Sequence, residues 1–111
     1  MQEIQSLLQT LGVGRNYVGF YQTARAVFLV LEDETRLESV TRYIFKAIGA
    51  ECGCSWRAVE RNIRTVIQRC WQINPQFLSG IARYPLAAPP TIVEFLDIVS
   101  LYLARKGVSA S

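Results

Sequence analysis

The chain has 111 residues, of which 50% are hydrophobic and 11% aromatic, and this composition supports one hydrophobic core and excludes intrinsic disorder. Its net charge is +3, no apolar run reaches the roughly 20 residues that span a bilayer, and the N-terminus lacks the pattern of a secretion signal. We therefore expect residues 1–111 to form a single cytoplasmic domain that does not insert into a membrane.

The cysteine and histidine content argues against catalysis and metal binding. Cys52 and Cys54 are separated by one residue, which is not a zinc-site spacing, and only Cys70 could join them. Three cysteines also argue against a disulfide framework. The chain has no histidine, the commonest general base, and no nucleophile paired with a base. We expect no enzyme activity, no cofactor and no metal, with Cys54 and Cys70 as small core residues.

The first 32 residues predict two helices. Apolar residues at helical spacing predict a short helix over about 4–11, which ends at Gly12. A second helix, capped by Asn16, has an apolar face wide enough for a central core helix. Glycine inside a helix costs about 1 kcal/mol relative to alanine, so Gly19 indicates close packing against a neighbour. The inward positions of the second helix, which runs to about Glu32, are Tyr17, Phe20, Tyr21, Ala24, Val27, Phe28 and Leu31.

A third helix is predicted to begin at Thr35. Thr35 and Glu38 have the spacing of a capping box, in which each side chain bonds the backbone N–H of the other residue. The helix would bury an apolar stripe that extends to Ile48. Arg42 and Lys46, four residues apart, share a different face. They are candidates for contacts to DNA phosphates, although two solvated cations fit the pattern equally well.

A tight turn is predicted between this helix and the next. Gly49 is a small residue at the point where two such helices approach closely, and Gly53 tolerates a positive φ. Cys54 is small and apolar enough to fit into the corner. Ser55 is a good N-cap for the following helix, and Val59 can fill the angle between the two helices.

The helix after the turn, over about 55–72, has two different faces at 100° per residue. An aliphatic stripe that anchors the helix and arginines that point outward are typical of a recognition helix, so the segment predicts a helix-turn-helix that reads DNA. An ordinary helical hairpin with a solvated arginine face is the alternative. Asn62 departs from the pattern, which would prefer an apolar residue. The inward residues are Val59, Ile63, Val66, Ile67, Cys70 and Trp71, and the outward residues are Arg57, Arg61, Arg64, Thr65 and Gln68.

The positive charge is concentrated in the predicted helix-turn-helix. Residues 39–72 carry six basic and two acidic side chains, a net charge of +4, whereas residues 1–38 have a net charge of −2. Ten of the twelve basic residues are arginine, whose planar guanidinium suits bidentate contacts to phosphate or guanine. This distribution favours a surface that attracts nucleic acid.

The C-terminal third predicts two more helices. Pro75 suits the first turn of a short helix that ends at Gly80, and a proline-rich connection follows at the surface. Thr91 and Glu94 form a second capping box, which opens the last helix. No segment has the period of a strand, so the expected fold is all-α, with about six helices. The inward residues of the last helix are Phe95, Ile98, Val99 and Tyr102.

Four segments resemble the family of C-terminal DNA-binding domains of stage 0 sporulation protein A, the response regulator that starts endospore formation in Firmicutes. They are IQSLLQTLGV, YVGFYQTARAV with the LED that ends its helix, VERNIRTVIQRCW and PTIVEFLDIVSLYL. The similarity extends from about residue 4 to residue 103, and V-E-R-x-I-R followed by an aliphatic pair and Trp71 is its most specific part. It implies a six-helix effector domain whose fourth helix enters the major groove of a GC-containing operator box.

The resemblance also assigns roles to individual residues. Glu60, Arg61 and Arg64 match positions that the family uses on bases and phosphates. An arginine can pair with guanine O6/N7 and a carboxylate can accept from cytosine N4, but a salt bridge between Glu60 and Arg64 is the alternative role. The candidates for base contacts are Arg57, Glu60, Arg61 and Arg64, and those for phosphate contacts are Arg42, Lys46, Ser55, Thr65 and Gln68.

The implied partners are double-stranded DNA with tandem boxes, a sigma subunit of RNA polymerase and a second copy of the chain on DNA. Ala58 and Thr65 replace residues that are commonly basic or polar in the family, which predicts a different preferred DNA sequence. Family regulators also carry a phosphorylated receiver domain, for which these 111 residues have no room. We expect an excised fragment or a stand-alone effector that phosphorylation does not switch in the family's way.

A helical protein-interaction module that no longer reads DNA is the alternative function. The segment over 75–90, with Phe77, Arg83 and Tyr84 as exposed candidates, would then contact RNA polymerase or another regulator. Failure to bind duplex DNA at low salt would favour this alternative.

Overall fold

The computed structural model describes residues 1–110, and all regular secondary structure in this range is helical, as predicted. A 3-10 segment, η1 (Glu34–Ser39), and a π-helical segment, η2 (Thr41–Phe45), connect the second and third α-helices. No helix in this range is long and apolar enough to cross a membrane. The six α-helices are α1 (Gln2–Thr10), α2 (Gly19–Glu32), α3 (Lys46–Cys52), α4 (Trp56–Ile73), α5 (Pro75–Ala82) and α6 (Ile92–Arg105).

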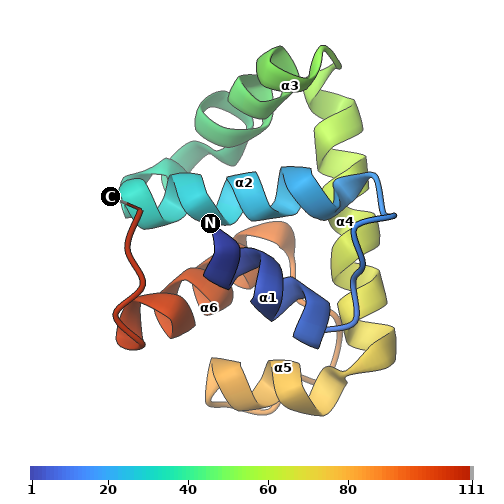
Figure 1. Cartoon of the computed structure of the whole chain (residues 1–111), viewed down its shortest axis with the longest axis vertical. Coiled ribbons are helices and arrows are strands. Elements are labelled where there is room, and N and C mark those ends of the chain that lie inside the picture. Colours follow the sequence, from blue (N-terminus) through green and yellow to red (C-terminus); the bar gives the residue numbers. More distant parts are fainter. Residues whose placement is uncertain (111) are drawn as a thin grey trace.

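Helix α2 lies at the centre of the fold, as its wide apolar face predicted. It crosses the middle of the molecule between α3 on one side and α1 and α6 on the other, and α4 runs across its N-terminal end (Figure 1). Phe20, Ala24 and Val27 of α2 are buried in one continuous core. Tyr21 was predicted to point inward, but its side chain is 51% exposed.

The start of α2 differs from the prediction. Asn16 does not cap the helix, because the chain makes turns at residues 15–18 and α2 begins at Gly19. The backbone N–H of Tyr17 donates to the Gly14 carbonyl, and that of Phe20 donates to the Tyr17 carbonyl. The prediction for the preceding helix is confirmed: α1 ends at Thr10 and Gly12 has a φ of 106°.

Gly19 is required where α2 meets α4. A Cβ atom placed on Gly19 would lie 2.4 Å from the Asn62 carbonyl oxygen and 2.8 Å from Cγ2 of Val66. Both distances are shorter than van der Waals contact, and the nearer atom belongs to backbone that cannot rotate away. The predicted close packing is therefore confirmed, and its partner is the recognition-helix candidate α4.

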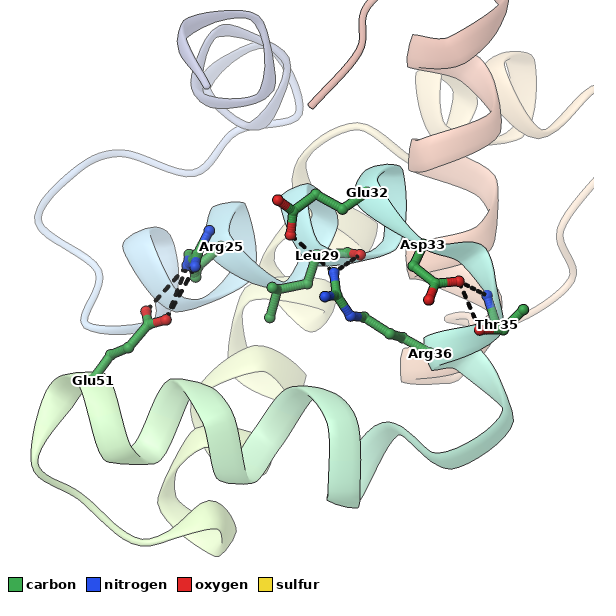
Figure 2. Close-up of polar contacts among 7 residues, drawn as sticks. All are labelled: Arg25, Leu29, Glu32, Asp33, Thr35, Arg36 and Glu51. Atoms are coloured by element: carbon green, nitrogen blue, oxygen red, sulfur yellow. Dashed lines mark hydrogen bonds and ion pairs between the residues drawn. The ribbon is translucent and has the colours of Figure 1, made fainter. Parts of the chain in front are cut away.

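The predicted capping box of the third helix is wrong. Thr35 is not the N-cap, because Asp33 takes that position with an extended backbone and its carboxylate accepts from the Thr35 N–H at 3.0 Å (Figure 2). The Thr35 hydroxyl also donates to this carboxylate, and these two hydrogen bonds hold the pKa of Asp33 below its usual value. The chain then forms η1 and η2 instead of one continuous helix, and only the last part, α3, is α-helical.

Helix α5 extends beyond its predicted end. It continues past Gly80 to Ala82, because burial of Ile81 against the core favours another turn, and it ends at Arg83 in the left-handed conformation with a φ of 66°. Phe77, expected to be exposed, is half-buried against the core, whereas Tyr84 is 49% exposed.

The predicted capping box of α6 is confirmed. The Thr91 hydroxyl accepts from the Glu94 N–H at 3.2 Å, and the Thr91 N–H donates to the Glu94 carboxylate at 3.0 Å. These bonds lower the pKa of Glu94. Phe95, Ile98 and Val99 are buried.

Replacing Gly19 by alanine tests the contact between α2 and α4. We expect Gly19→Ala to lower the free energy of unfolding by about 1–3 kcal/mol, because overpacking at the Asn62 carbonyl outweighs the gain in helix propensity. Urea unfolding measures the change.

Gly80 provides the matched control, because it also lies in a helix but a Cβ there meets nothing within 4 Å. Gly80→Ala should raise the free energy of unfolding by about 0.5–1 kcal/mol. Equal stabilisation by both substitutions would contradict the close approach of α2 to α4.

Candidate nucleic-acid interface

The turn between α3 and α4 has the predicted geometry. Gly53 is left-handed, with a φ of 70° and a ψ of 33°. A Cβ on Gly49 would lie 2.6 Å from the Cys54 carbonyl oxygen, so only glycine fits there. The Ser55 hydroxyl accepts from the Ala58 N–H at 3.2 Å and caps α4. The residues of the turn therefore direct α4 away from α3 at a fixed angle.

Helix α4 has one buried and one exposed face. The predicted inward residues are buried except Trp71, which is half-buried against the core. The helix lies along one edge of the molecule (Figure 1). The predicted outward residues Arg57, Arg61, Arg64, Thr65 and Gln68 are all exposed.

A buried glutamine of α2 holds both the turn and α4, and sequence reasoning missed it. Gln22 is 5% exposed, its Oε1 accepts from Asn62 Nδ2 at 3.0 Å, and its Nε2 donates to Cys54 Sγ at 3.7 Å. Asn62, which departed from the apolar pattern, is therefore the partner that satisfies a buried amide. The polar pair fixes the rotation of α4 about its own axis relative to α2.

A salt bridge connects α3 to the same central helix. Arg25 of α2 contacts both carboxylate oxygens of Glu51 in α3, with Nε at 3.1 Å from Oε1 and Nη2 at 3.1 Å from Oε2 (Figure 2). The carboxylate raises the pKa of Arg25. Both helices of the helix-turn-helix are thus attached to α2 through side chains.

The exposed side chains of α4 differ in what they contact within residues 1–110. The Arg57 guanidinium lies 4.6 Å from the ring centroid of Trp56. Arg64 pairs with Glu60 at 3.3 Å, so the salt bridge considered as the alternative role of Glu60 is present. Arg61 makes no ion pair or side-chain hydrogen bond in the described range.

The remaining candidates also lie at the surface. Arg42 and Lys46 are exposed, and the Arg42 guanidinium lies 5.4 Å from the ring centroid of Tyr43. The exposed Thr65 hydroxyl donates to the Arg61 carbonyl at 3.1 Å. The Ser55 oxygen accepts the capping bond, which leaves its O–H available as a donor.

The sequence matches the family described as "Sporulation initiation factor Spo0A C terminal" over residues 4–103. The chain belongs to this family. Its members are DNA-binding effector domains that act in the regulation of sporulation.

In this Spo0A-family chain one arginine of α4, Arg69, does not belong to the exposed face of the helix. Arg69 is half-buried, its Nε donates to the Gly12 carbonyl at 3.3 Å, and its guanidinium lies 5.6 Å from the ring centroid of Tyr17. It therefore attaches the loop between α1 and α2 to the side of α4. Its place at the edge of the helical wheel, beside the buried stripe, is the sequence signal for this role.

Cys70 lies in the hydrophobic core, as predicted. It is fully buried, and burial raises the pKa of its thiol to about 12. The thiol is therefore neutral at physiological pH. A cysteine binds a metal ion as the thiolate, so Cys70 is a poor candidate for a metal ligand. Cys54, by contrast, is only half-buried.

Because Gln22 is buried and its partner Asn62 is only half-buried, we expect substitutions at the two positions to lower stability by different amounts. Asn62→Leu leaves the buried Gln22 carbonyl oxygen without a donor and should lower the free energy of unfolding by about 1–3 kcal/mol. Gln22→Leu should cost less, because Asn62 is only half-buried and water can replace its partner. Urea unfolding measures both effects.

The double variant completes this cycle. Gln22→Leu with Asn62→Leu should be more stable than Asn62→Leu alone, because no buried amide then lacks a partner. Strict additivity of the two single effects would show that the two side chains do not interact.

Proposed function

We propose that this chain binds double-stranded DNA sequence-specifically, with α4 in the major groove, and thereby regulates transcription linked to the start of sporulation. One observation carries the proposal: a helix anchored by a fully buried aliphatic face presents three exposed arginines on its other side. An α-helix about 10–12 Å in diameter fits the major groove, which is about 12 Å wide. The membership of the family supports the same function.

Arg61 is the leading candidate to read a base. It lies almost opposite the centre of the buried stripe at 100° per residue, so it points directly away from the core. Within the described range its guanidinium has no carboxylate partner from which DNA would have to displace it. A bidentate pair with guanine contributes about 1–3 kcal/mol of discrimination between bases.

Arg64 and Glu60 form the second part of the proposed reading surface. The Arg64 side chain of their salt bridge is exposed to solvent, and solvent-exposed ion pairs contribute about 0.2–1 kcal/mol to stability. A bidentate guanine contact is stronger, so DNA can draw Arg64 away and leave Glu60 to accept from a cytosine. Arg57, held over Trp56 near the start of α4, completes the proposed set of base contacts.

The proposed phosphate contacts surround this reading surface. Arg42 and Lys46 extend from η2 and the start of α3, the helix that crosses the DNA backbone in a helix-turn-helix. Ser55, Thr65 and Gln68 supply neutral donors along α4. Such contacts fix the register of the protein and carry no sequence information of their own.

Tandem operator boxes, pairing of two copies on DNA and contact with a sigma subunit are finer parts of the same proposal. Arg83 and Tyr84, exposed after the end of α5, provide a surface that is separate from the outward residues of α4. This surface is also what a protein-interaction module without DNA binding would use.

Fluorescence anisotropy of a labelled duplex tests the proposed function. The probes are a duplex with two tandem sporulation-type boxes and a scrambled duplex, each titrated across a salt series. We expect tighter binding to the tandem boxes and a steep fall in affinity with salt. Absence of binding to either duplex at low salt would overturn the proposal and favour the protein-interaction module.

The same assay separates base contacts from phosphate contacts. Arg61→Ala should weaken specific binding by about 1–3 kcal/mol, and Arg61→Lys should not restore it, because an ammonium lacks the planar fork. Arg42→Ala or Lys46→Ala should weaken binding to both duplexes alike and lower the salt slope by about one. Equal losses on both duplexes for Arg61→Ala, with rescue by lysine, would remove Arg61 from the reading role.

A further inference from the structure

The loop between α1 and α2, residues 12–18, lies against the side of α4 although the two are about fifty residues apart in sequence (Figure 1). Two contacts of Arg69 hold it there, and two glycines, Gly12 in the loop and Gly19 at the start of α2, allow the close approach. Arg69 of α4 donates to the Gly12 carbonyl and covers the ring of Tyr17. A Cβ on Gly12 would collide with Ile73 at 2.5 Å, and one on Gly19 with the Asn62 carbonyl oxygen. The loop is therefore a fixed extension of α4.

The loop borders the exposed face of α4 at Thr65. It encloses with α4 a shallow notch of about 340 Å³, which reaches Thr65, an outward residue that follows Arg61 by one helical turn. A second hollow, which the loop forms with Gln5 of α1 and Tyr21 of α2, includes Arg15. Residues lining the notch are Asn16, Tyr17, Val18, Gly19, Asn62 and Thr65.

The loop carries one charged side chain, the cation Arg15. Arg15 is exposed and makes no ion pair within residues 1–110. The sequence has no acidic residue from Gln5 to Leu31, so nothing on the loop itself repels an anion. Val18, also in the loop, is 75% exposed.

We infer that this loop is a second contact with DNA, in which Arg15 binds a backbone phosphate beside the major groove occupied by α4. The inference rests on the proposed function. A helix that fills the groove has a phosphate strand on each flank, so an element fixed to the side of the helix meets one of those strands. Asn16 and the exposed edge of Val18 lie against the same strand, and Arg15 supplies the charge that it requires.

The test compares Arg15→Ala with the wild-type full chain by fluorescence anisotropy on the scrambled duplex and on the tandem-box duplex, across a salt series. We expect binding about fivefold weaker on both duplexes and a salt slope lower by about one, because one phosphate contact is lost. Arg15→Lys keeps the charge and should remain within about twofold of wild type.

Arg105→Ala is the matched control. It removes the same charge from an exposed arginine at the C-terminal end of α6, on the side of the molecule away from α4 (Figure 1). It should change affinity by less than about twofold. The three variants should unfold at the same urea concentration as wild type, because neither arginine has a carboxylate partner in the described range.

Two outcomes would overturn the inference, and they are distinguishable. If the wild-type chain binds DNA but Arg15→Ala binds as tightly as wild type, or loses no more than Arg105→Ala, the loop makes no phosphate contact and the proposed function stands. If the wild-type chain binds neither duplex, the proposed function falls and this inference falls with it.

Discussion

The rest of the structure depends on the contact between α2 and α4. Gly19 allows the start of α2 to approach the backbone of α4, and the hydrogen bond between Gln22 and Asn62 fixes the rotation of α4. The bidentate pair between Arg25 and Glu51 attaches α3 to the same central helix. Because an interface must hold its side chains in place before DNA arrives, this attachment determines which face of α4 is exposed.

The contacts of the surface arginines have a second consequence, which concerns entropy. A free arginine side chain loses about 2 kcal/mol of conformational freedom when it is immobilised. Stacking of Arg57 on Trp56 restricts the Arg57 side chain before binding. Folding therefore meets part of the entropic cost of ordering Arg57, which favours a rigid and selective contact with DNA.

Local signals in the sequence predicted the elements that depend on local interactions. The turn at Gly53, the caps at Ser55 and Thr91 and the two faces of α4 follow from neighbouring residues, and all are confirmed. The prediction was wrong at Thr35 because a neighbouring residue, Asp33, is a better N-cap. The Asp33 carboxylate accepts the hydrogen bond from the Thr35 N–H. Burial decided the end of α5, since Ile81 extends the helix past Gly80.

Sequence patterns could not predict the contacts between residues that lie far apart in the chain. Asn62 could be recognised as a departure, but its partner Gln22 lies 40 residues away. The arginine face of α4 was predictable from periodicity, whereas the attachment of Arg69 to the loop at Gly12 required the tertiary structure.

The most direct test of the central claim is a titration of the isotopically labelled chain with the tandem-box duplex, followed by amide chemical shifts in NMR spectra. The largest shifts should fall on the turn at residues 53–55, the exposed positions of α4 and the loop at 12–18. Shifts confined to α5 and the connection after Arg83, with α4 unchanged, would contradict the account and place the functional surface elsewhere.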